Sequence, residues 1–212
     1  MCRTEACLGY LFLTVIFGYA ILIFGLLKYR KHLNANDLQI NSEQIWQMRP
    51  RFVLSRNISK SDMIFGVWRD KTATISELVV KNSFDKIIGV VEHRWGSREY
   101  RIVLGDQIFR VELPLIWGGV VANLVSEDGK IQAIYERKSL SLVNHKFTII
   151  NSGELKSKRS LFRLRQSIEY SLNEKFVGMT YQISPFRKIG RVGFFQLNDP
   201  LPIKIFILAI CI

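Results

Sequence analysis

A run of cations between residues 156 and 165 is the densest group of charged side chains, and its chemistry is the binding of anions. We expect a strand from Ser160 to Leu172, broken at most once, on which Arg163 and Arg165 share one face because successive side chains alternate. Beside an anionic membrane each cation would contribute roughly 1 kcal/mol. The alternative is a solvated strand face whose charges blunt a sheet edge. The candidate lipid-binding residues in this run are Lys156, Lys158, Arg159, Arg163 and Arg165.

The whole chain is basic, with a formal net charge of +12 over 212 residues. This charge favours an anionic partner, namely phospholipid headgroups, nucleic acid or an acidic protein. Nucleic acid is the weaker candidate, because sequence-tolerant binding needs aromatic residues interleaved with cations. Phe162 is the only aromatic residue in the cationic run, and Tyr100 between Arg98 and Arg101 is a second, weaker site.

Catalysis and metal binding have little support in the sequence. The Gly-x-Ser-x-Gly, P-loop, His-Glu-x-x-His and dinucleotide glycine motifs are all missing from it. We interpret His93, near a strand end, and His145, in a tight turn, as structural residues. Cysteine occurs only in the apolar ends, so the sequence offers neither a disulfide framework nor a Cys-based zinc site. We expect a protein that is not an enzyme and uses neither a cofactor nor a metal ion.

Two apolar ends enclose the polar part of the chain, and the first is long enough to cross a membrane. Residues 6–27 carry no charge, and about 20 apolar residues span a bilayer as a helix. The positive-inside rule then puts the C-terminal domain in the cytoplasm, because one arginine precedes the span and three cations follow it. A cleaved signal peptide is the alternative, although the apolar run is long for one. The cations after the span, which are further lipid-binding candidates, are Lys28, Arg30 and Lys31.

The sequence therefore predicts three parts: residues 1–31 as a single-pass anchor with a basic flank, 32–50 as a linker or short helix, and 51–212 as a β domain. In the linker, Asn41 or Ser42 suits the N-cap of a helix that Pro50 would end.

After residue 50 the hydrophobic period becomes two, and turn residues separate the apolar stretches. About a dozen strands must close into a barrel or fold into two layers, because a twisted open sheet rarely exceeds about ten strands. The turns include Asn144-His145 and Asn151-Ser152-Gly153. We expect barrel packing for the aromatic residues Trp68, Trp95, Trp117, Phe194 and Phe195. The predicted strands are 51–54, 63–68, 74–81, 87–94, 99–104, 107–113, 117–125, 130–137, 140–143, 146–150, 160–172, 176–183 and 190–196.

The second apolar end, from Pro200 to Ile212, is too short to be another membrane span. About ten residues remain after Pro202, or some 15 Å of helix. A helix that is apolar on all sides is usually buried in a core, so we predict that residues 201–212 fill the barrel. A truncated longer segment is the alternative.

Two hairpin starts resemble each other and a known superfamily. Asp85-Lys86-Ile87-Ile88-Gly89 and Glu174-Lys175-Phe176-Val177-Gly178 both run acidic-Lys-apolar-apolar-Gly after a turn, through either duplication or convergent hairpin chemistry. With the closing stretch from Leu201 to Ile212, they give residues 51–212 a pattern that resembles the tubby C-terminal-like superfamily. That superfamily includes the LURP-one-related proteins and the phospholipid scramblases.

The resemblance implies a barrel of about twelve antiparallel strands around a C-terminal hydrophobic helix. It also implies binding of phosphoinositides through basic surface residues, as in tubby proteins. The chain departs from the scramblases, which are anchored through their C-terminal segment. We therefore expect a membrane-anchored, non-enzymatic module that contacts anionic phospholipid or a membrane partner at the cytoplasmic face. The alternatives are a scramblase-like lipid transporter and a protein scaffold of the membrane.

Overall fold

The computed structural model describes residues 15–19, 41–49, 53, 56, 58–114, 119–138, 144–159, 167–184 and 187–210. The chain divides into two compact units, Met1–Gln39 and Ile40–Ile212. In the first unit, residues 15–19 are helical and exposed. None of the helices described is both long and apolar enough to cross a membrane. The expected span at 6–27 lies mostly outside the described residues, as do Lys28, Arg30 and Lys31, so the anchor stays a prediction.

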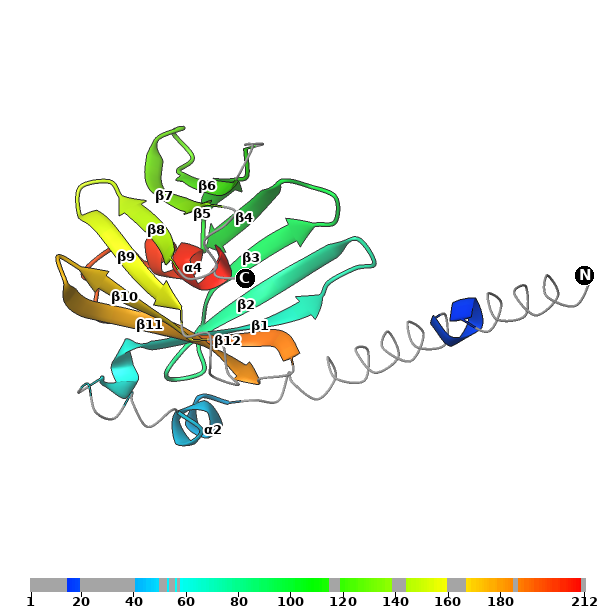
Figure 1. Ribbon diagram of the computed structural model, residues 1–212, viewed down its shortest axis with the longest axis horizontal. Coiled ribbons are helices and arrows are strands. Elements are labelled where there is room, and N and C mark those ends of the chain that lie inside the picture. Colours follow the sequence, from blue (N-terminus) through cyan, green and yellow to red (C-terminus); the bar gives the residue numbers. More distant parts are fainter. Residues whose placement is uncertain are drawn as a thin grey trace, which may run out of the picture. The chain divides into compact units, whose positions relative to one another are not determined.

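The second unit is a closed barrel of twelve strands (Figure 1). Every strand pairs antiparallel with its sequence neighbours, and β1 pairs with β12 to close the barrel, so the prediction of a mainly β barrel is confirmed. The strands are β1 (Met63–Asp70), β2 (Ile75–Asn82), β3 (Ile87–Arg94), β4 (Glu99–Leu104), β5 (Gln107–Glu112), β6 (Gly119–Val125), β7 (Ile131–Lys138), β8 (Asn144–Ile149), β9 (Gly153–Arg159), β10 (Ser167–Leu172), β11 (Lys175–Ser184) and β12 (Arg187–Phe195).

Three features of the predicted strand pattern are wrong. Residues 153–159 form β9, although we expected a turn and a charged loop there. Asn144 and His145 lie on β8 and not in a turn. The described residue of the predicted first strand, Val53, has a helical backbone. Residues 140–143 lie outside the described residues.

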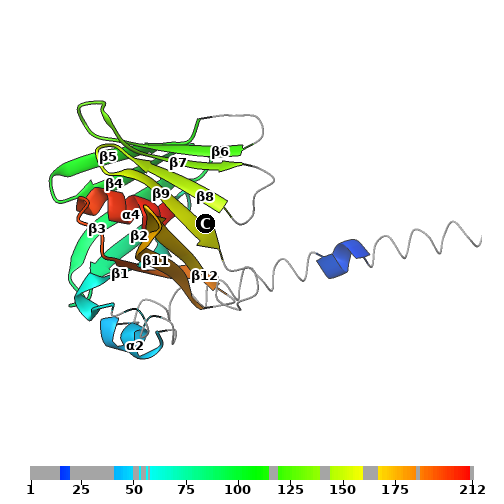
Figure 2. The ribbon, with the colours of Figure 1, turned by 60° about the vertical axis from the view of Figure 1, so that its left-hand side comes forward.

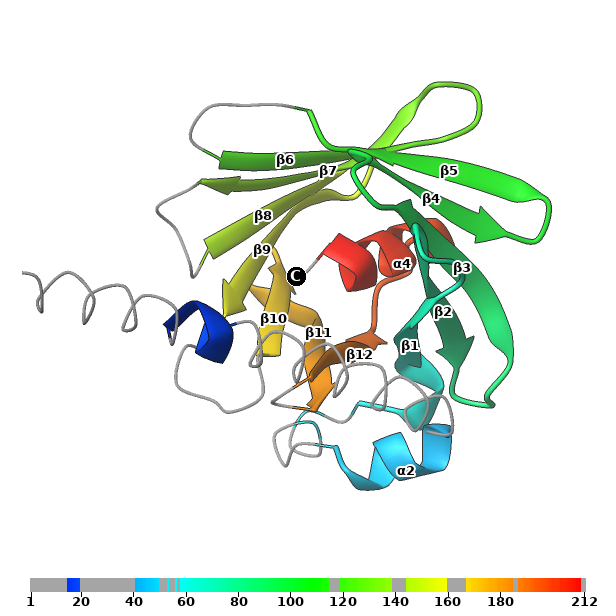
Figure 3. The same cartoon turned by 90° about the vertical axis from the view of Figure 1, so that its right-hand side faces the viewer.

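The C-terminal helix α4 (Leu201–Ile210) fills the barrel, and two views from different sides both show it enclosed by strands (Figures 2 and 3). Four successive side chains, from Ile205 to Leu208, have no exposed surface. The Phe206 ring meets the Phe147 ring of β8 edge to face, with 6.1 Å between their centroids. The expectation of a C-terminal core helix is confirmed for residues 201–210, because its apolar surface finds strands on every side.

A second apolar cluster lies on the outer face of β1, β11 and β12, under the short helix α2 (Ser42–Gln47). Ile45 of α2 is buried in this cluster, and the Trp46 ring lies 5.9 Å from the ring of Phe194. Phe194 therefore packs outside the barrel, whereas its neighbour Phe195 belongs to the interior cluster. Both are buried, as expected, because neighbouring side chains of β12 point to opposite faces and both faces are covered.

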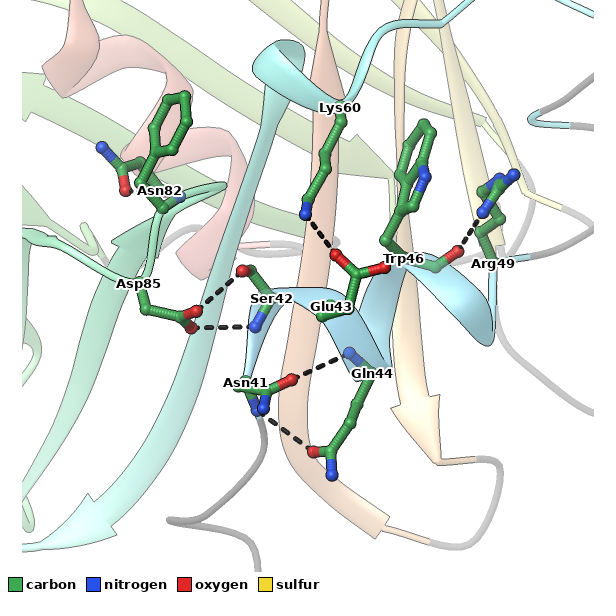
Figure 4. A network of polar contacts seen from close by, with 10 residues as sticks. Asn41, Ser42, Glu43, Gln44, Trp46, Arg49, Lys60, Asn82 and Asp85 are labelled. Carbon is green, nitrogen blue, oxygen red and sulfur yellow. Dashed lines mark hydrogen bonds and ion pairs between the residues drawn. The ribbon is translucent and has the colours of Figure 1, made fainter.

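Helix α2 is joined to the barrel through its first turn (Figure 4). Asn41 is the N-cap, and its side chain accepts from the Gln44 backbone N–H at 2.9 Å. The Asp85 carboxylate, in the β2–β3 turn, accepts from the backbone N–H and the hydroxyl of Ser42 at 2.8 and 2.7 Å. A carboxylate at a helix N-terminus is favourable because it meets otherwise unpaired N–H groups.

The expectation that Trp95 packs in the barrel is wrong, because 85% of its surface is exposed. Trp68 is half-buried against the interior cluster, and Trp117 lies outside the described residues.

Candidate anion-binding end of the barrel

The up-and-down topology gives the barrel two ends of different charge. We call the end where the odd-numbered strands finish the basic end, and the end where they begin the acidic end. Exposed cations near the basic end are Arg69, Lys71, Arg94, Arg98, Arg101 and Lys158, beside the exposed carboxylates of Asp70 and Glu136. Exposed acidic residues in the turns of the acidic end are Asp85, Asp106, Glu127, Asp128 and Glu174, beside Lys86, Lys130 and Lys175.

Part of the positive charge at the basic end is neutralised by a network on the outer face of β1 to β3. Glu77 is buried, and its carboxylate forms ion pairs with Arg69 and with Lys71. Lys71 Nζ also lies 2.6 Å from a carboxylate oxygen of Glu92, and this hydrogen bond raises the pKa of Lys71. These cations already have carboxylate partners, so they are poor candidates for an external anion.

Strand β9 carries the part of the predicted cationic run that the structure describes. Lys156 and Lys158 are exposed on its outer face, whereas Ser157 between them is buried and Arg159 is half-buried. Neither lysine forms an ion pair with a described residue. Arg163 and Arg165 lie outside the described residues, so the structure brings together only the two lysines of the predicted group.

The neighbouring strand adds a third cation to this face. Lys146 of β8 lies directly opposite Lys156, and its Nζ is 2.9 Å from a carboxylate oxygen of Glu154. The hydrogen bond to Glu154 raises the pKa of Lys146. A shallow pocket beside Lys156 is lined by Glu154, Asn173 and Glu174 as well, so its charge is mixed. We define the β9 patch as Lys156 and Lys158, the two exposed lysines of this strand that form no ion pair with a described residue.

Two further arginines lie at the basic end, of which sequence reasoning missed Arg94 and considered Arg98 only as a neighbour of Tyr100 in a weak nucleic-acid site. Arg94 and Arg98 stand on either side of the β3–β4 turn, where both are exposed. Neither forms an ion pair within the described part of the chain. The Gly96-Ser97 pair between them could have identified these arginines, because glycine and serine favour a turn and so place their neighbours at the tip of a loop.

Polar side chains also lie inside the barrel. Arg191 is buried, and its guanidinium donates to the Leu208 carbonyl near the C-terminus of α4 at 3.2 Å. A cation is favourable there because the last carbonyls of a helix lack intrahelical partners. The side chain of His145 is buried, with Nδ1 2.6 Å from the Tyr135 hydroxyl. Burial raises the pKa of Tyr100, and its ring stacks on His93. These contacts join strands to each other and to α4.

Among the described residues, no group of three or more His, Cys, Asp and Glu side chains is arranged to hold a metal ion. The described residues place exposed cations at one end of the barrel. Comparison of the chain with family models, with curated proteins and with solved structures finds no match.

Proposed function

We propose that this chain is a membrane-anchored, non-enzymatic module whose barrel binds anionic lipid headgroups at the cytoplasmic face. The observation that carries the proposal is the set of exposed cations near the basic end that have no carboxylate partner among the described residues. Those cations are Lys158 of the β9 patch with Arg94 and Arg98 of the β3–β4 turn, and Lys156, in the middle of β9, adds a fourth. Arg163 and Arg165, which come between β9 and β10 in the sequence, lie outside the described residues.

The number of exposed cations sets the expected strength of the attraction to an anionic membrane. Four cations at about 1 kcal/mol each would supply on the order of 4 kcal/mol near an anionic surface. An anchor at residues 6–27 would add to this attraction, because it would keep the barrel at a high effective concentration beside the bilayer. Lys28, Arg30 and Lys31, which directly follow that segment, would add to the attraction.

The resemblance to the tubby C-terminal-like superfamily supports the same proposal. The observed architecture, twelve antiparallel strands around a C-terminal helix, has the form that the resemblance implies. Tubby proteins bind phosphoinositides through basic residues on the barrel surface. We propose that this chain shares that fold family and that general ligand class.

Flotation of the unit of residues 40–212 with liposomes tests the proposal. This unit holds both apolar clusters, and a cooperative thermal transition would first show that it folds alone. We expect it to float with vesicles that contain phosphatidylserine, but not with vesicles of phosphatidylcholine alone. Replacing Lys156 and Lys158 by Glu should reduce flotation strongly. The matched control replaces Lys130 and Lys175, exposed lysines of the acidic end, by Glu.

The control makes the same change of net charge, so a loss confined to the β9 variant would assign binding to that surface. Equal flotation of the wild type and the β9 variant would overturn the assignment. Failure of the wild type to float with either vesicle would overturn the proposed function.

A further inference from the structure

Trp95 is the most exposed of the large apolar side chains that the structure describes, at 85% of its surface. Burial of an aromatic side chain is favourable by roughly 1.5–3 kcal/mol. An exposed indole ring therefore forgoes this free energy unless a partner covers it. The ring lies at the tip of the β3–β4 hairpin, at the basic end of the barrel.

The turn that carries Trp95 is built to hold the ring outward. The Ser97 N–H donates to the Arg94 carbonyl at 2.9 Å, which closes a four-residue turn with Trp95 in its second position. Gly96, in the third position, has φ of 79°, the left-handed value that a type II turn requires there. Trp95 therefore stands at the tip of the hairpin, where its side chain is exposed.

Neighbouring elements hold the tip in place from both sides. The backbone N–H of Trp95 donates to the Thr74 carbonyl in the β1–β2 turn at 2.8 Å. On the other side, the Leu113 N–H, which follows β5, donates to the Arg98 carbonyl at 3.0 Å. Below the tip, the rings of His93 and Tyr100 stack with 4.3 Å between their centroids. The exposure of Trp95 is therefore a property of an ordered hairpin.

The flanking charges identify what would cover the ring. Arg94 and Arg98 are exposed beside Trp95, and neither pairs with a described carboxylate. Guanidinium groups bind phosphate oxygens, and tryptophan prefers the headgroup level of a bilayer because it has an apolar body and a polar N–H.

The other exposed apolar side chains have different surroundings. The most exposed of them, Phe84, is 82% exposed in the β2–β3 turn at the acidic end, next to Asp85. Carboxylates beside an apolar side chain would be repelled by an anionic membrane. At Trp95, in contrast, an exposed apolar ring lies beside two cations that have no described carboxylate partner. This combination favours an anionic bilayer as the partner of the hairpin.

We propose that the β3–β4 turn inserts the Trp95 ring into the headgroup region of an anionic bilayer, with Arg94 and Arg98 on lipid phosphates. This inference rests on the proposed function and deepens it, because it names the point of contact and so directs the basic end of the barrel toward the membrane. The contact also gives the binding an apolar component that salt does not screen.

Quenching of tryptophan emission by brominated lipid tests the insertion directly. The full-length chain is reconstituted into phosphatidylserine and phosphatidylcholine vesicles with or without brominated acyl chains. In a background that carries Trp117→Phe, since position 117 lies outside the described residues, we expect brominated lipid to reduce the emission of the chain with Trp95 clearly more than that of the Trp95→Phe variant. The two tryptophans left in that variant, Trp46 and Trp68, are half-buried. Replacing Arg94 and Arg98 by Gln should reduce the quenching, and vesicles of phosphatidylcholine alone should do the same. Unchanged circular dichroism would show that each variant folds.

Equal quenching of the wild type and Trp95→Phe in anionic vesicles would overturn the inference, and so would quenching that needs neither arginine. If the β3–β4 turn binds an acidic protein and not lipid, the wild type and Trp95→Phe should be quenched equally. If the unit of residues 40–212 still floats with anionic vesicles in that case, the inference fails and the proposed function stands. If flotation is lost as well, both fail.

Discussion

Replacement of Phe206 by Ala is the perturbation that most directly tests α4 as the centre of the barrel. Phe206 has no exposed surface, and its ring packs edge to face on Phe147 of β8. Truncation removes a whole phenyl ring from a site with strands on every side, so the space cannot easily collapse. Such changes cost about 3–5 kcal/mol. Phe84→Ala is the matched control, because it removes the same atoms from a ring that is 82% exposed. We expect the control to change stability by less than about 0.5 kcal/mol.

Urea unfolding of the unit of residues 40–212, followed by far-ultraviolet circular dichroism, measures both variants. With a slope of about 2 kcal/mol per molar urea, Phe206→Ala should lower the midpoint by about 2 M. Deletion of residues 203–212 should abolish the cooperative transition. A cost below about 1 kcal/mol for Phe206→Ala, or a value equal to that of Phe84→Ala, would refute the assignment of α4 as the core.

Two further predictions concern turns of the acidic end. Asp85→Gly removes the carboxylate that caps Ser42 and should lower the free energy of unfolding by about 1–2 kcal/mol in urea titrations, with Asp85→Asn losing less. The hydrogen bond from Lys130 holds the pKa of Asp128 at about 2, so NMR should find that Lys130→Ala raises it. Because the folded pKa is depressed, the small stabilisation by this exposed pair is present above about pH 4 and is lost as pH falls toward about 2.

Local turn chemistry made much of the strand pattern predictable. The bounds of β3 and β4 were predicted as they are observed, and Gly105-Asp106 marks where the chain reverses after β4. The C-terminal helix was also predictable, because a stretch that is apolar on all sides but too short for a bilayer fits a core. The pairing of β1 with β12 depends on contacts between distant segments, which no local pattern specifies.

The errors have physical causes as well. Strand β9 was missed because its inward positions hold Leu155, Ser157 and Arg159, only one of which is apolar. His145 was placed in a turn because Asn144 precedes it, yet its ring is buried beside the Tyr135 hydroxyl, a tertiary contact. Both cases show that the interior of this barrel accepts polar groups near the basic end, where strict apolar alternation fails.

The candidate site was only partly predictable, for a related reason. Charge density along the sequence indicated Lys156 and Lys158 of the β9 patch, but it did not join Arg94 to Arg98, which are four residues apart and of which only Arg98 was considered, beside Tyr100. Trp95 was assigned to the core because large aromatic residues are usually buried. Trp95 is exposed because it lies in a turn. The Gly96-Ser97 pair that follows it indicates this turn, but the usual burial of tryptophan led to the wrong prediction.

The central claim is that the basic end of the barrel faces an anionic membrane, and a pair of spin labels tests it most directly. Ala73 in the β1–β2 turn and Glu127 in the β6–β7 turn are both exposed, and they lie at opposite ends of the barrel. Each is replaced by a labelled cysteine in residues 40–212, with Cys211 replaced by Ser, and collision of the label with a water-soluble relaxation agent is measured on phosphatidylserine vesicles. We predict that the label at position 73 is shielded from the agent when vesicles are added and that the label at position 127 stays fully accessible. Shielding at position 127, or equal accessibility at both positions on bound protein, would contradict the account.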